Sequence, residues 1–293
     1  MFNSYEYKFF IFVFREKGFL QPKQLLSNQR FLEDIILSRE PTKRFSDRVE
    51  NYIRYRPTYP KELISEMKKQ RLLSEDSVIA DVGSGTGIFT KLLLKTGNIV
   101  YAVEPNDEMR GAAEKILGWY PNFISVNGQA EATTLQRRSV DLITVAQSFH
   151  WFNQEETKWE FKRILKPTGR LALVYNSRQI ERSPFMIDYD RMLVKYCIEY
   201  EGIAKQYINL KMAKDFFGTT EVTRFVCNNY QIFNFDGLKG RLLSSSYTLK
   251  EHEDGYQLLM DKLEALFEKH QENDQVQFTY ETELFYGKPV FPD

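Results

Sequence analysis

Three glycines at alternate positions, Gly83, Gly85 and Gly87, follow a short apolar run and precede a helical pattern of apolar residues. This order predicts a strand, a tight turn and a helix. Glycines in such a turn allow backbone angles that are closed to other residues, and they let a ligand approach the main chain without meeting a Cβ atom. Because ligands of open α/β sheets bind at the carboxyl ends of the strands, we expect a small-molecule site at this turn.

The spacing of the glycines narrows the class of ligand. A dinucleotide fingerprint needs a third glycine at position 88, where the chain has Ile88, so a nicotinamide-dependent oxidoreductase is disfavoured. No Gly-Lys-Ser/Thr follows, which argues against a P-loop. Asp81 lies two residues before the first glycine, and Glu104 ends the next predicted strand. A carboxylate at that strand end can accept hydrogen bonds from both hydroxyls of a ribose.

The motif Asp81-x-Gly-x-Gly-x-Gly87 together with Glu104 resembles the class I S-adenosylmethionine-dependent methyltransferases over about residues 43–293. The resemblance implies an α/β, Rossmann-like fold with a seven-stranded, mostly parallel sheet, an antiparallel last strand, helices on both faces and a helical insertion after strand 5. It also implies S-adenosylmethionine as the cofactor and S-adenosylhomocysteine as its product. The cofactor-binding residues that it implies are Asp81, Gly83, Ser84, Gly85, Gly87, Glu104, Pro105, Asn106, Gln129, Ala130, Glu131, Gln147, Tyr52 and Tyr59.

Two further segments are similar to a small-molecule subgroup that includes the trans-aconitate methyltransferases. Residues 52–60 read Y-x-x-x-R-P-x-Y-P, and residues 148–152 read Ser-Phe-His-Trp-Phe. The first segment is predicted to form a lid over the cofactor, with plain packing against the sheet as the alternative. This resemblance implies catalytic roles for His150 and Arg56 and substrate contacts for Trp151, Tyr175 and Arg178.

The acceptor decides which of these side chains the reaction needs. A carboxylate acceptor needs no base, and Arg56 or Arg178 would orient it. A hydroxyl acceptor would make His150 useful as a general base. The alternative for His150 is a buried, hydrogen-bonded residue beside aromatic rings. Enzymes that methylate nucleobase nitrogens typically carry Asn/Asp-Pro-Pro-aromatic at this strand end, whereas residues 146–151 read Ala-Gln-Ser-Phe-His-Trp, so that activity is disfavoured.

Composition disfavours several other classes of protein. Forty basic and forty acidic residues cancel, so no overall field favours nucleic acid, and no apolar run approaches the roughly 20 residues of a membrane helix. Cys197 and Cys227 are far apart and the three histidines form no metal signature, so we expect no metal. Free thiols fit a reducing, cytoplasmic setting.

The chain divides, by its sequence, into an N-terminal extension of unknown role at residues 1–42 and a methyltransferase domain at residues 43–293, with a helical cap insertion at residues 178–217. Asn106 and Asn153 are expected to cap helices. Residues 166–170 are expected to form a Pro-Gly turn, and further helices are expected at residues 61–73 and 250–270. Predicted strands occupy residues 77–82, 98–103, 123–126, 140–146, 171–175, 221–235 and 275–285.

These observations predict a methyltransferase that transfers a methyl group from S-adenosylmethionine to a small molecule, at a carboxylate or hydroxyl oxygen. We expect a monomer or a homodimer, with neither nucleic acid nor membrane as partner. Two alternatives stay open. One is a non-catalytic module that binds S-adenosylmethionine, and the other, which Ile88 disfavours, is a nicotinamide-dependent oxidoreductase.

Overall fold

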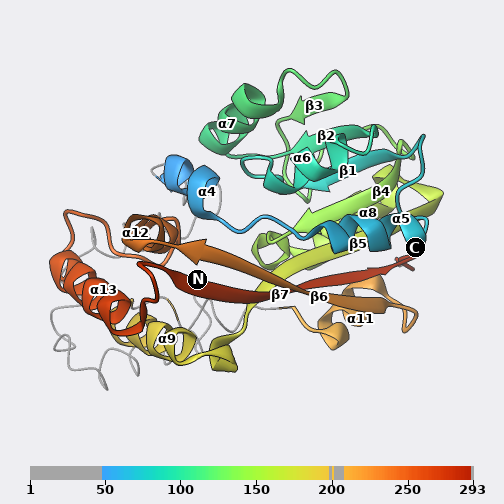
Figure 1. Cartoon of the computed structure of the whole chain (residues 1–293). Coiled ribbons are helices and arrows are strands. Elements are labelled where there is room, and N and C mark those ends of the chain that lie inside the picture. The colour runs from blue at the N-terminus through green and yellow to red at the C-terminus, as the bar shows by residue number, and fades with distance from the viewer. Residues whose placement is uncertain (1–47, 198–199, 201–207, 292–293) are drawn as a thin grey trace, which may run out of the picture. The chain divides into compact units, whose positions relative to one another are not determined.

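One seven-stranded sheet, of order β3-β2-β1-β4-β5-β7-β6, organises the protein (Figure 1). The computed structural model describes residues 48–197, 200 and 208–291, all within a compact unit that spans Phe45–Asp293. The predicted extension, residues 1–42, lies outside the described residues. The strands are β1 (Val78–Val82), β2 (Ile99–Val103), β3 (Phe123–Val126), β4 (Val140–Ala146), β5 (Leu165–Arg178), β6 (Thr223–Phe233) and β7 (Val276–Gly287).

Strands β1 to β5 run parallel to one another, and β7 lies antiparallel between β5 and β6. This confirms the predicted Rossmann-like, mostly parallel sheet with an antiparallel last strand. The register pairs Val82 with Val103, and Val103 with Val126. The loops that follow these strands therefore leave the sheet at one common edge.

The predicted Pro-Gly turn at residues 166–170 is wrong, because this segment belongs to β5. Leu165 pairs with Val140, and the next pair joins Arg170 to Leu142, so the register shifts between them. The surplus residues form a bulge within a continuing strand instead of reversing the chain. Pairing with β4 on both sides of residues 166–169 thus keeps the chain in one strand, against the local turn preference.

Helices that connect the parallel strands begin where their caps predict. Asn106 Oδ1 accepts a hydrogen bond from Met109 N (2.8 Å), and Asn153 Oδ1 accepts one from Glu156 N (3.4 Å), which confirms both predicted caps. The helix expected at residues 61–73 ends earlier, at Lys69. The elements are α4 (Val49–Tyr55), α5 (Lys61–Lys69), α6 (Ile88–Leu94), α7 (Asp107–Leu117), the 3₁₀ turn η2 (Phe149–Trp151) and α8 (Gln154–Ile164).

The predicted helical insertion after strand 5 is confirmed. It contains η3 (Ile180–Arg182), α9 (Pro184–Tyr196) and α11 (Leu210–Phe217); α12 (Phe235–Leu243) and α13 (Tyr256–His270) follow β6. The last helix begins at Tyr256 rather than at Lys250. The reason is Gly255, whose φ of 91° is left-handed and interrupts the helical path.

Apolar side chains are buried on both faces of the sheet and in a third cluster beyond it. One face packs Phe149, Phe161 and Phe216 against the strands, and the other packs Leu63 and Phe89. The third cluster joins α9, α12 and α13 to the far part of β7. Ala146, the last residue of β4, pairs with Val174, whereas β5 continues to Arg178. The strands β5, β7 and β6 thus extend past β4 and support α9, α12 and α13. These three helices form the helical cap.

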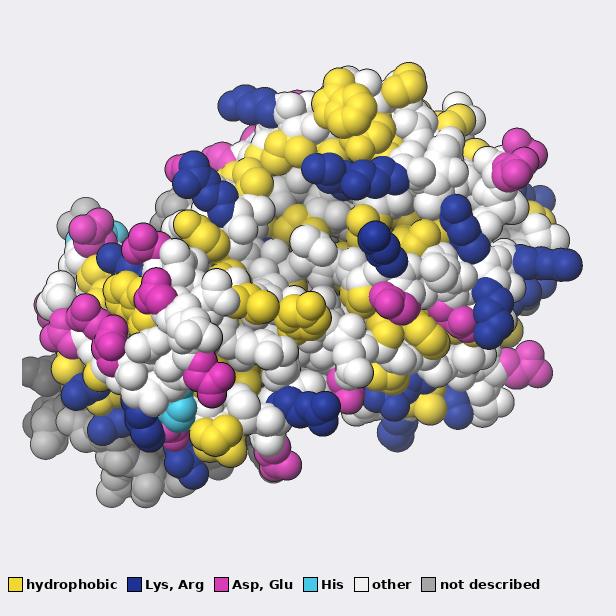
Figure 2. Space-filling model, in the orientation of Figure 1, with side chains coloured by type: hydrophobic (Ala, Val, Ile, Leu, Met, Phe, Trp, Pro, Cys, Tyr) yellow, Lys and Arg dark blue, Asp and Glu magenta, His cyan; other side chains and the backbone are white. Residues whose placement is uncertain are grey.

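The surface carries both signs of charge. Figure 2 shows Lys and Arg side chains spread over the visible face, with Asp and Glu side chains between them. Several ion pairs join residues of the same helix. Lys158 pairs with Glu155 in α8 (2.8 Å), and Lys211 pairs with Asp215 in α11 (2.7 Å). None of the helices within the described residues has the length and apolar character needed to cross a bilayer.

Candidate active site

The loop between β1 and α6 holds three glycines in left-handed backbone conformations. The φ angles of Gly83, Gly85 and Gly87 are 68°, 58° and 82°. A Cβ atom at Gly83 would lie 2.5 Å from Ser148 Oγ, and one at Gly87 would lie 2.4 Å from Leu117 Cδ1. A Cβ atom at Gly85 would meet nothing within 4 Å. Packing therefore requires two of the glycines, whereas the third borders open space.

Glu104 ties this loop to the end of β2. Its Oε2 accepts a hydrogen bond from Gly85 N (2.8 Å) and its Oε1 accepts one from Asn106 N (2.9 Å). Burial raises the pKa of the Glu104 carboxyl, while the two backbone N–H groups and Arg110 favour the charged form. Each carboxylate oxygen keeps a further lone pair, so Glu104 can still accept hydrogen bonds from a ligand.

Asp81 lies beneath the loop and is fully buried. Its Oδ2 accepts a hydrogen bond from Thr90 Oγ1 (2.6 Å), and its Oδ1 accepts one from Thr144 Oγ1 (2.8 Å). Burial raises the pKa of the Asp81 carboxyl to about 6, against the effect of both hydroxyls. Both oxygens therefore face groups of the protein, and the side chain anchors the loop between β1, α6 and β4.

Two hydroxyls of the loop have no hydrogen-bond partner among the described residues. Ser84 Oγ and Thr86 Oγ1 are buried, and neither forms a hydrogen bond to any described residue. Because nearly all buried polar atoms in proteins are hydrogen-bonded, such orphaned atoms indicate a polar group that binds there. The orphaned hydroxyls, the open space at Gly85 and the carboxylate of Glu104 together fit a polar small molecule.

The segment after β3 forms a narrow turn that also supports the start of α8. Gln129 and Ala132 exchange two backbone hydrogen bonds (3.2 and 3.1 Å) and form a narrow turn. Glu131 Oε1 accepts a hydrogen bond from Asn153 N (2.7 Å), so this carboxylate supports the start of α8. Ala130 is buried, whereas the side chain of Gln129 is exposed at the edge where the parallel strands end.

The segment after β4 carries the predicted base. Gln147 has a left-handed φ of 62°, which is strained for a residue with a side chain and is typical of functional sites. The backbone then enters η2, which contains His150 and Trp151. His150 Nδ1 lies 3.4 Å from the hydroxyl of Tyr175, and its ring centroid lies 4.7 Å from that of Trp151.

The connection between α4 and α5 joins this edge from another side. Tyr59 is buried, and its ring packs edge-on against Phe89 of α6 at 4.9 Å. The guanidinium of Arg56 lies 4.9 Å from the ring centroid of Tyr52 and donates from Nη2 to the carbonyl of Ser244 (2.8 Å). Tyr59 thus supports the glycine loop, while Arg56 is directed toward the end of α12.

Most predicted site residues meet at the carboxyl edge of the parallel strands, whereas Arg56 is directed toward α12 and Arg178 lies farther along β5. Arg178 lies four residues beyond Val174, the partner of the last β4 residue, and four strand residues span about 13 Å. There it donates to the hydroxyl of Tyr200 (2.8 Å). The residues at the common edge are Asp81, Gly83, Ser84, Gly85, Gly87, Glu104, Pro105, Asn106, Gln129, Ala130, Glu131, Gln147, His150, Trp151 and Tyr175.

Two buried residues of the cap were not predicted from the sequence, Arg241 on α12 and Tyr189 on α9. An arginine or tyrosine within an amphipathic helix resembles a solvated or packing residue, so no local signal could have identified either. No group of three or more His, Cys, Asp or Glu side chains arranged to hold a metal occurs among residues 48–197, 200 and 208–291.

Comparisons with known proteins agree with this geometry. A family model described as a methyltransferase domain matches residues 80–173. An uncharacterized methyltransferase-like protein of Schizosaccharomyces pombe is 30% identical over 251 residues, which are 83% of this chain and 94% of that protein. An uncharacterized methyltransferase of Mycobacterium tuberculosis is 37% identical over 134 residues, 46% of this chain and 52% of that protein.

Solved structures show the same fold. A provisionally assigned type II methyltransferase from Anaeromyxobacter dehalogenans superposes on this chain with a TM-score of 0.59 and is 18% identical in sequence. The superposition covers 82% of this chain and 100% of that methyltransferase. This superposition shows that the two chains share a fold. The chain therefore belongs to the class I S-adenosylmethionine-dependent methyltransferase family.

Proposed function

We propose that this chain binds S-adenosylmethionine at the glycine loop and transfers its methyl group to a small-molecule acceptor, at a carboxylate or hydroxyl oxygen. The observation that carries the proposal is the open space at Gly85, bordered by the carboxylate of Glu104 and by the orphaned hydroxyls of Ser84 and Thr86. Family membership supports the choice of cofactor.

Specific residues would hold each part of the cofactor. The free lone pairs of Glu104 suit the ribose hydroxyls, and the amide of Gln129 suits the adenine edge. Gly85 leaves the main chain open to the methionine moiety, where the two orphaned hydroxyls can pair with its polar ends. When bound, the cofactor supplies an electrophilic methyl group on a sulfonium.

The chain's own contribution is to position the acceptor and to exclude water. Holding the nucleophile in line with the methyl carbon can supply effective molarities of about 10⁵ to 10⁸ M. The α4–α5 connection, with Tyr59 buried against α6, covers this edge and limits hydrolysis. For a hydroxyl acceptor, one ring nitrogen of His150 would take the proton, while Tyr175 orients the ring through Nδ1.

Calorimetric titration with S-adenosylhomocysteine and with NAD tests the cofactor. We expect saturable binding of the first and none of the second; the reverse result would support the oxidoreductase alternative. Binding without turnover on a broad panel of carboxylic acids and alcohols would support the non-catalytic alternative.

The acceptor atom is tested with His150→Ala. With a hydroxyl acceptor the variant should lose about 10²-fold in turnover, whereas with a carboxylate acceptor turnover should hardly change, because no proton has to be removed. The pH profile of turnover separates the cases further, since only the first requires a neutral imidazole.

A further inference from the structure

Two arginines beside the helical cap, Arg241 (buried) and Arg56 (partly buried), have only neutral hydrogen-bond partners within the described part of the chain. Arg241 is 5% exposed; its Nε donates to the hydroxyl of Tyr280 (3.2 Å) and its Nη1 to Ser245 Oγ (3.0 Å). Arg56 donates from Nη2 to the carbonyl of Ser244 (2.8 Å), and its buried Nε has no acceptor within residues 48–197, 200 and 208–291. No Asp or Glu among the described residues forms an ion pair with either arginine.

No carboxylate among the described residues balances the charge of these two arginines. Burial favours the neutral form of Arg241, but the phenols of Tyr280, Tyr247 and Tyr189 raise its pKa. Burial lowers the pKa of Arg56, and the nearby charge of Arg241 lowers it further. The carbonyls at the C-terminal end of α12 supply a negative partial charge equivalent to about half an elementary charge. Two full positive charges exceed that amount, and a buried cation costs free energy unless an anion approaches it. The position therefore favours an anion.

A third polar group of the cap lies against the same ring as Arg241. Tyr189 is 1% exposed, and its hydroxyl has no hydrogen-bond partner among the described residues. Its ring packs edge-on against Phe278 at 4.8 Å, and the guanidinium carbon of Arg241 lies 5.6 Å from the centroid of Phe278. An O–H donor beside guanidinium N–H donors suits a carboxylate, which only accepts hydrogen bonds.

This group lies away from the end of the sheet where the reaction is proposed to occur. Tyr175, which contacts His150, precedes Arg178 by three residues on β5. Arg178 pairs across the sheet with Tyr280, the hydrogen-bond partner of Arg241. Three strand residues span about 10 Å. Arg241 therefore lies about 10 Å farther along β5 than the end of the sheet that contains His150.

We propose that Arg241, Arg56 and the hydroxyl of Tyr189 bind a carboxylate of the methyl acceptor that is not the methylated group. This inference rests on the proposed methyl transfer. The acceptor is then an elongated acid, with one anionic group about 10 Å from the atom that receives the methyl group. Binding energy from that remote group holds the reacting end in line, which is how contacts outside the reacting centre increase turnover.

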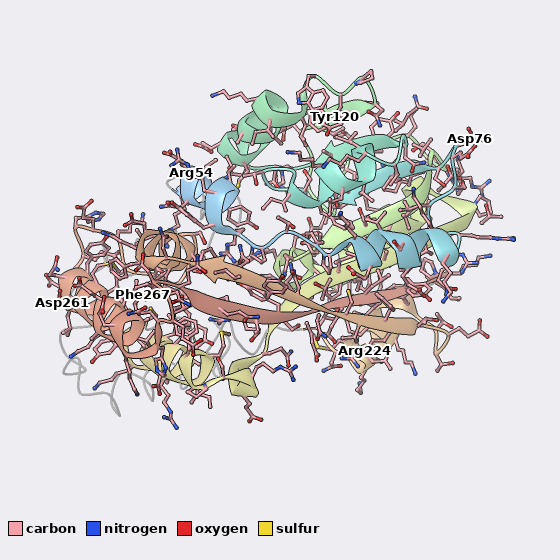
Figure 3. All side chains as sticks on the ribbon, in the orientation of Figure 1. Arg54, Asp76, Tyr120, Arg224, Asp261 and Phe267 are labelled. Carbon is pink, nitrogen blue, oxygen red and sulfur yellow. The ribbon has the colours of Figure 1, made fainter. Side chains whose placement is uncertain are left out.

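The test titrates protein saturated with S-adenosylhomocysteine with glutarate, pimelate and azelate, and with the diols of equal length. We expect the longest diacid, azelate, to bind best and the diols not to bind. Arg241→Met and Arg56→Gln should each weaken azelate binding by about 30-fold or more, because a charge-assisted contact is lost. Arg54→Gln is the matched control, because Arg54 is exposed on α4 and paired with Glu50 (Figure 3).

A second readout separates ligand binding from a structural role of Arg241. Replacing a buried cation that lacks an acidic partner by Met should leave the melting temperature unchanged or raise it, whereas loss of a structural arginine lowers it. If Arg241→Met does not fold, Arg241→Lys keeps the charge and should bind azelate measurably but more weakly.

Three results contradict the proposal. They are the absence of diacid binding to the saturated wild-type protein, equal binding by Arg241→Met, and equal binding of the diols. Failure of S-adenosylhomocysteine itself to bind is a different result, because it overturns the proposed methyl transfer on which the anion site rests.

Discussion

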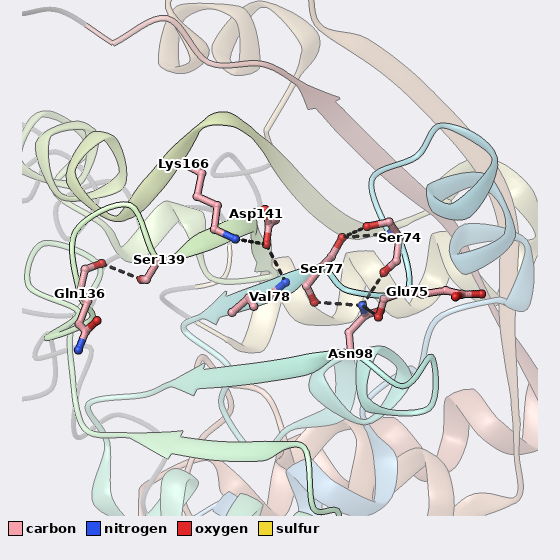
Figure 4. Close-up of polar contacts among 9 residues, drawn as sticks. All are labelled: Ser74, Glu75, Ser77, Val78, Asn98, Gln136, Ser139, Asp141 and Lys166. Carbon is pink, nitrogen blue, oxygen red and sulfur yellow. Dashed lines mark hydrogen bonds and ion pairs between the residues drawn. The ribbon is translucent and has the colours of Figure 1, made fainter.

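Polar groups at the two ends of the sheet differ in how completely they are hydrogen-bonded within the protein. At the amino ends of the strands, Asn98 Nδ2 donates to three carbonyls, and Asp141 Oδ2 accepts from Val78 N (3.0 Å) and from Lys166 Nζ (2.7 Å) (Figure 4). At the carboxyl ends, the buried hydroxyls of Ser84 and Thr86 have no partner within the described chain.

We expect the polar groups at the amino ends to contribute to stability and those at the carboxyl ends to contribute to the proposed function. The amino-end groups satisfy one another, so their loss should cost folding free energy and nothing else. In our proposal the groups at the carboxyl ends bind a ligand, which would explain the buried, unsatisfied hydroxyls there. Three glycines with positive φ and the strained backbone of Gln147 occur at the same end. Substitutions at the two ends should therefore change different measured quantities.

The largest expected effect is the pH dependence caused by Asp81. Burial raises its pKa in the folded state to about 6 from an ordinary value of 3.8. The stability that this carboxyl contributes is therefore full below pH 3.8 and is lost as the pH rises through 6, by about 3 kcal/mol. Urea unfolding of wild type and Asp81→Asn should show their difference in unfolding free energy falling by that amount between pH 4 and pH 7.

Asp188 provides the opposite case for the same measurement. Lys269 and then His270 hold the pKa of Asp188 at about 2. Its contribution to stability is present above pH 3.8 and is lost only as the pH falls toward 2. The pH dependence that this carboxyl contributes therefore lies mainly below pH 4 and has the opposite sign to that of Asp81. A flat difference for Asp81→Asn in that range would contradict the account of its buried carboxyl.

The next effect compares one carboxylate from each end. Glu104→Gln removes the charge from a group that binds two backbone N–H groups and, in our proposal, the ribose, so affinity for S-adenosylhomocysteine should fall about 100-fold. Asp141→Asn changes the amino-end carboxylate in the same way and should leave affinity within about two-fold, since it touches only Val78 and Lys166. Calorimetric titration of both variants measures the two affinities. Equal losses of affinity would contradict the proposed difference between the two ends of the sheet.

The smallest of the three effects concerns stability alone. Asn98 is buried and donates to the carbonyls of Ser74 (2.6 Å), Glu75 (3.3 Å) and Ser77 (3.0 Å). Asn98→Ala should lower the unfolding free energy by about 2 kcal/mol, because these carbonyls lose their donor. Denaturant unfolding measures the loss. Affinity for S-adenosylhomocysteine should stay unchanged, and a loss of affinity without a loss of stability would count against the division.

Local chemistry made much of the fold predictable. The bounds of β3 and β4 were predicted to the residue, because short apolar runs end at turn residues, and Asn106 and Asn153 cap their helices as expected. The turn expected at residues 166–170 was wrong because Leu165 and Arg170, on either side of residues 166–169, both pair with β4 and the strand continues through them. Where sequence-distant contacts decide the outcome, the local pattern carries no signal.

The site was predictable to the same degree. The glycine loop and Glu104 follow from their spacing along two consecutive strands, and the structure brings them into contact. Arg241 and Tyr189 could not be identified, because only the packing of α12 and α9 against β7 buries them. The roles of His150, Trp151 and Arg56 in the reaction stay predictions.

One pair of variants tests the central claim most directly. Gly85 and Gly97 both have positive φ, and a Cβ atom at either would meet nothing within 4 Å, but only Gly85 borders the proposed cofactor site. Gly85→Ala and Gly97→Ala should cost a similar free energy of unfolding, about 1–2 kcal/mol. Titration with S-adenosylhomocysteine should show at least a 10-fold loss of affinity for Gly85→Ala and none for Gly97→Ala. Equal affinities in the two variants would contradict a cofactor site at the glycine loop.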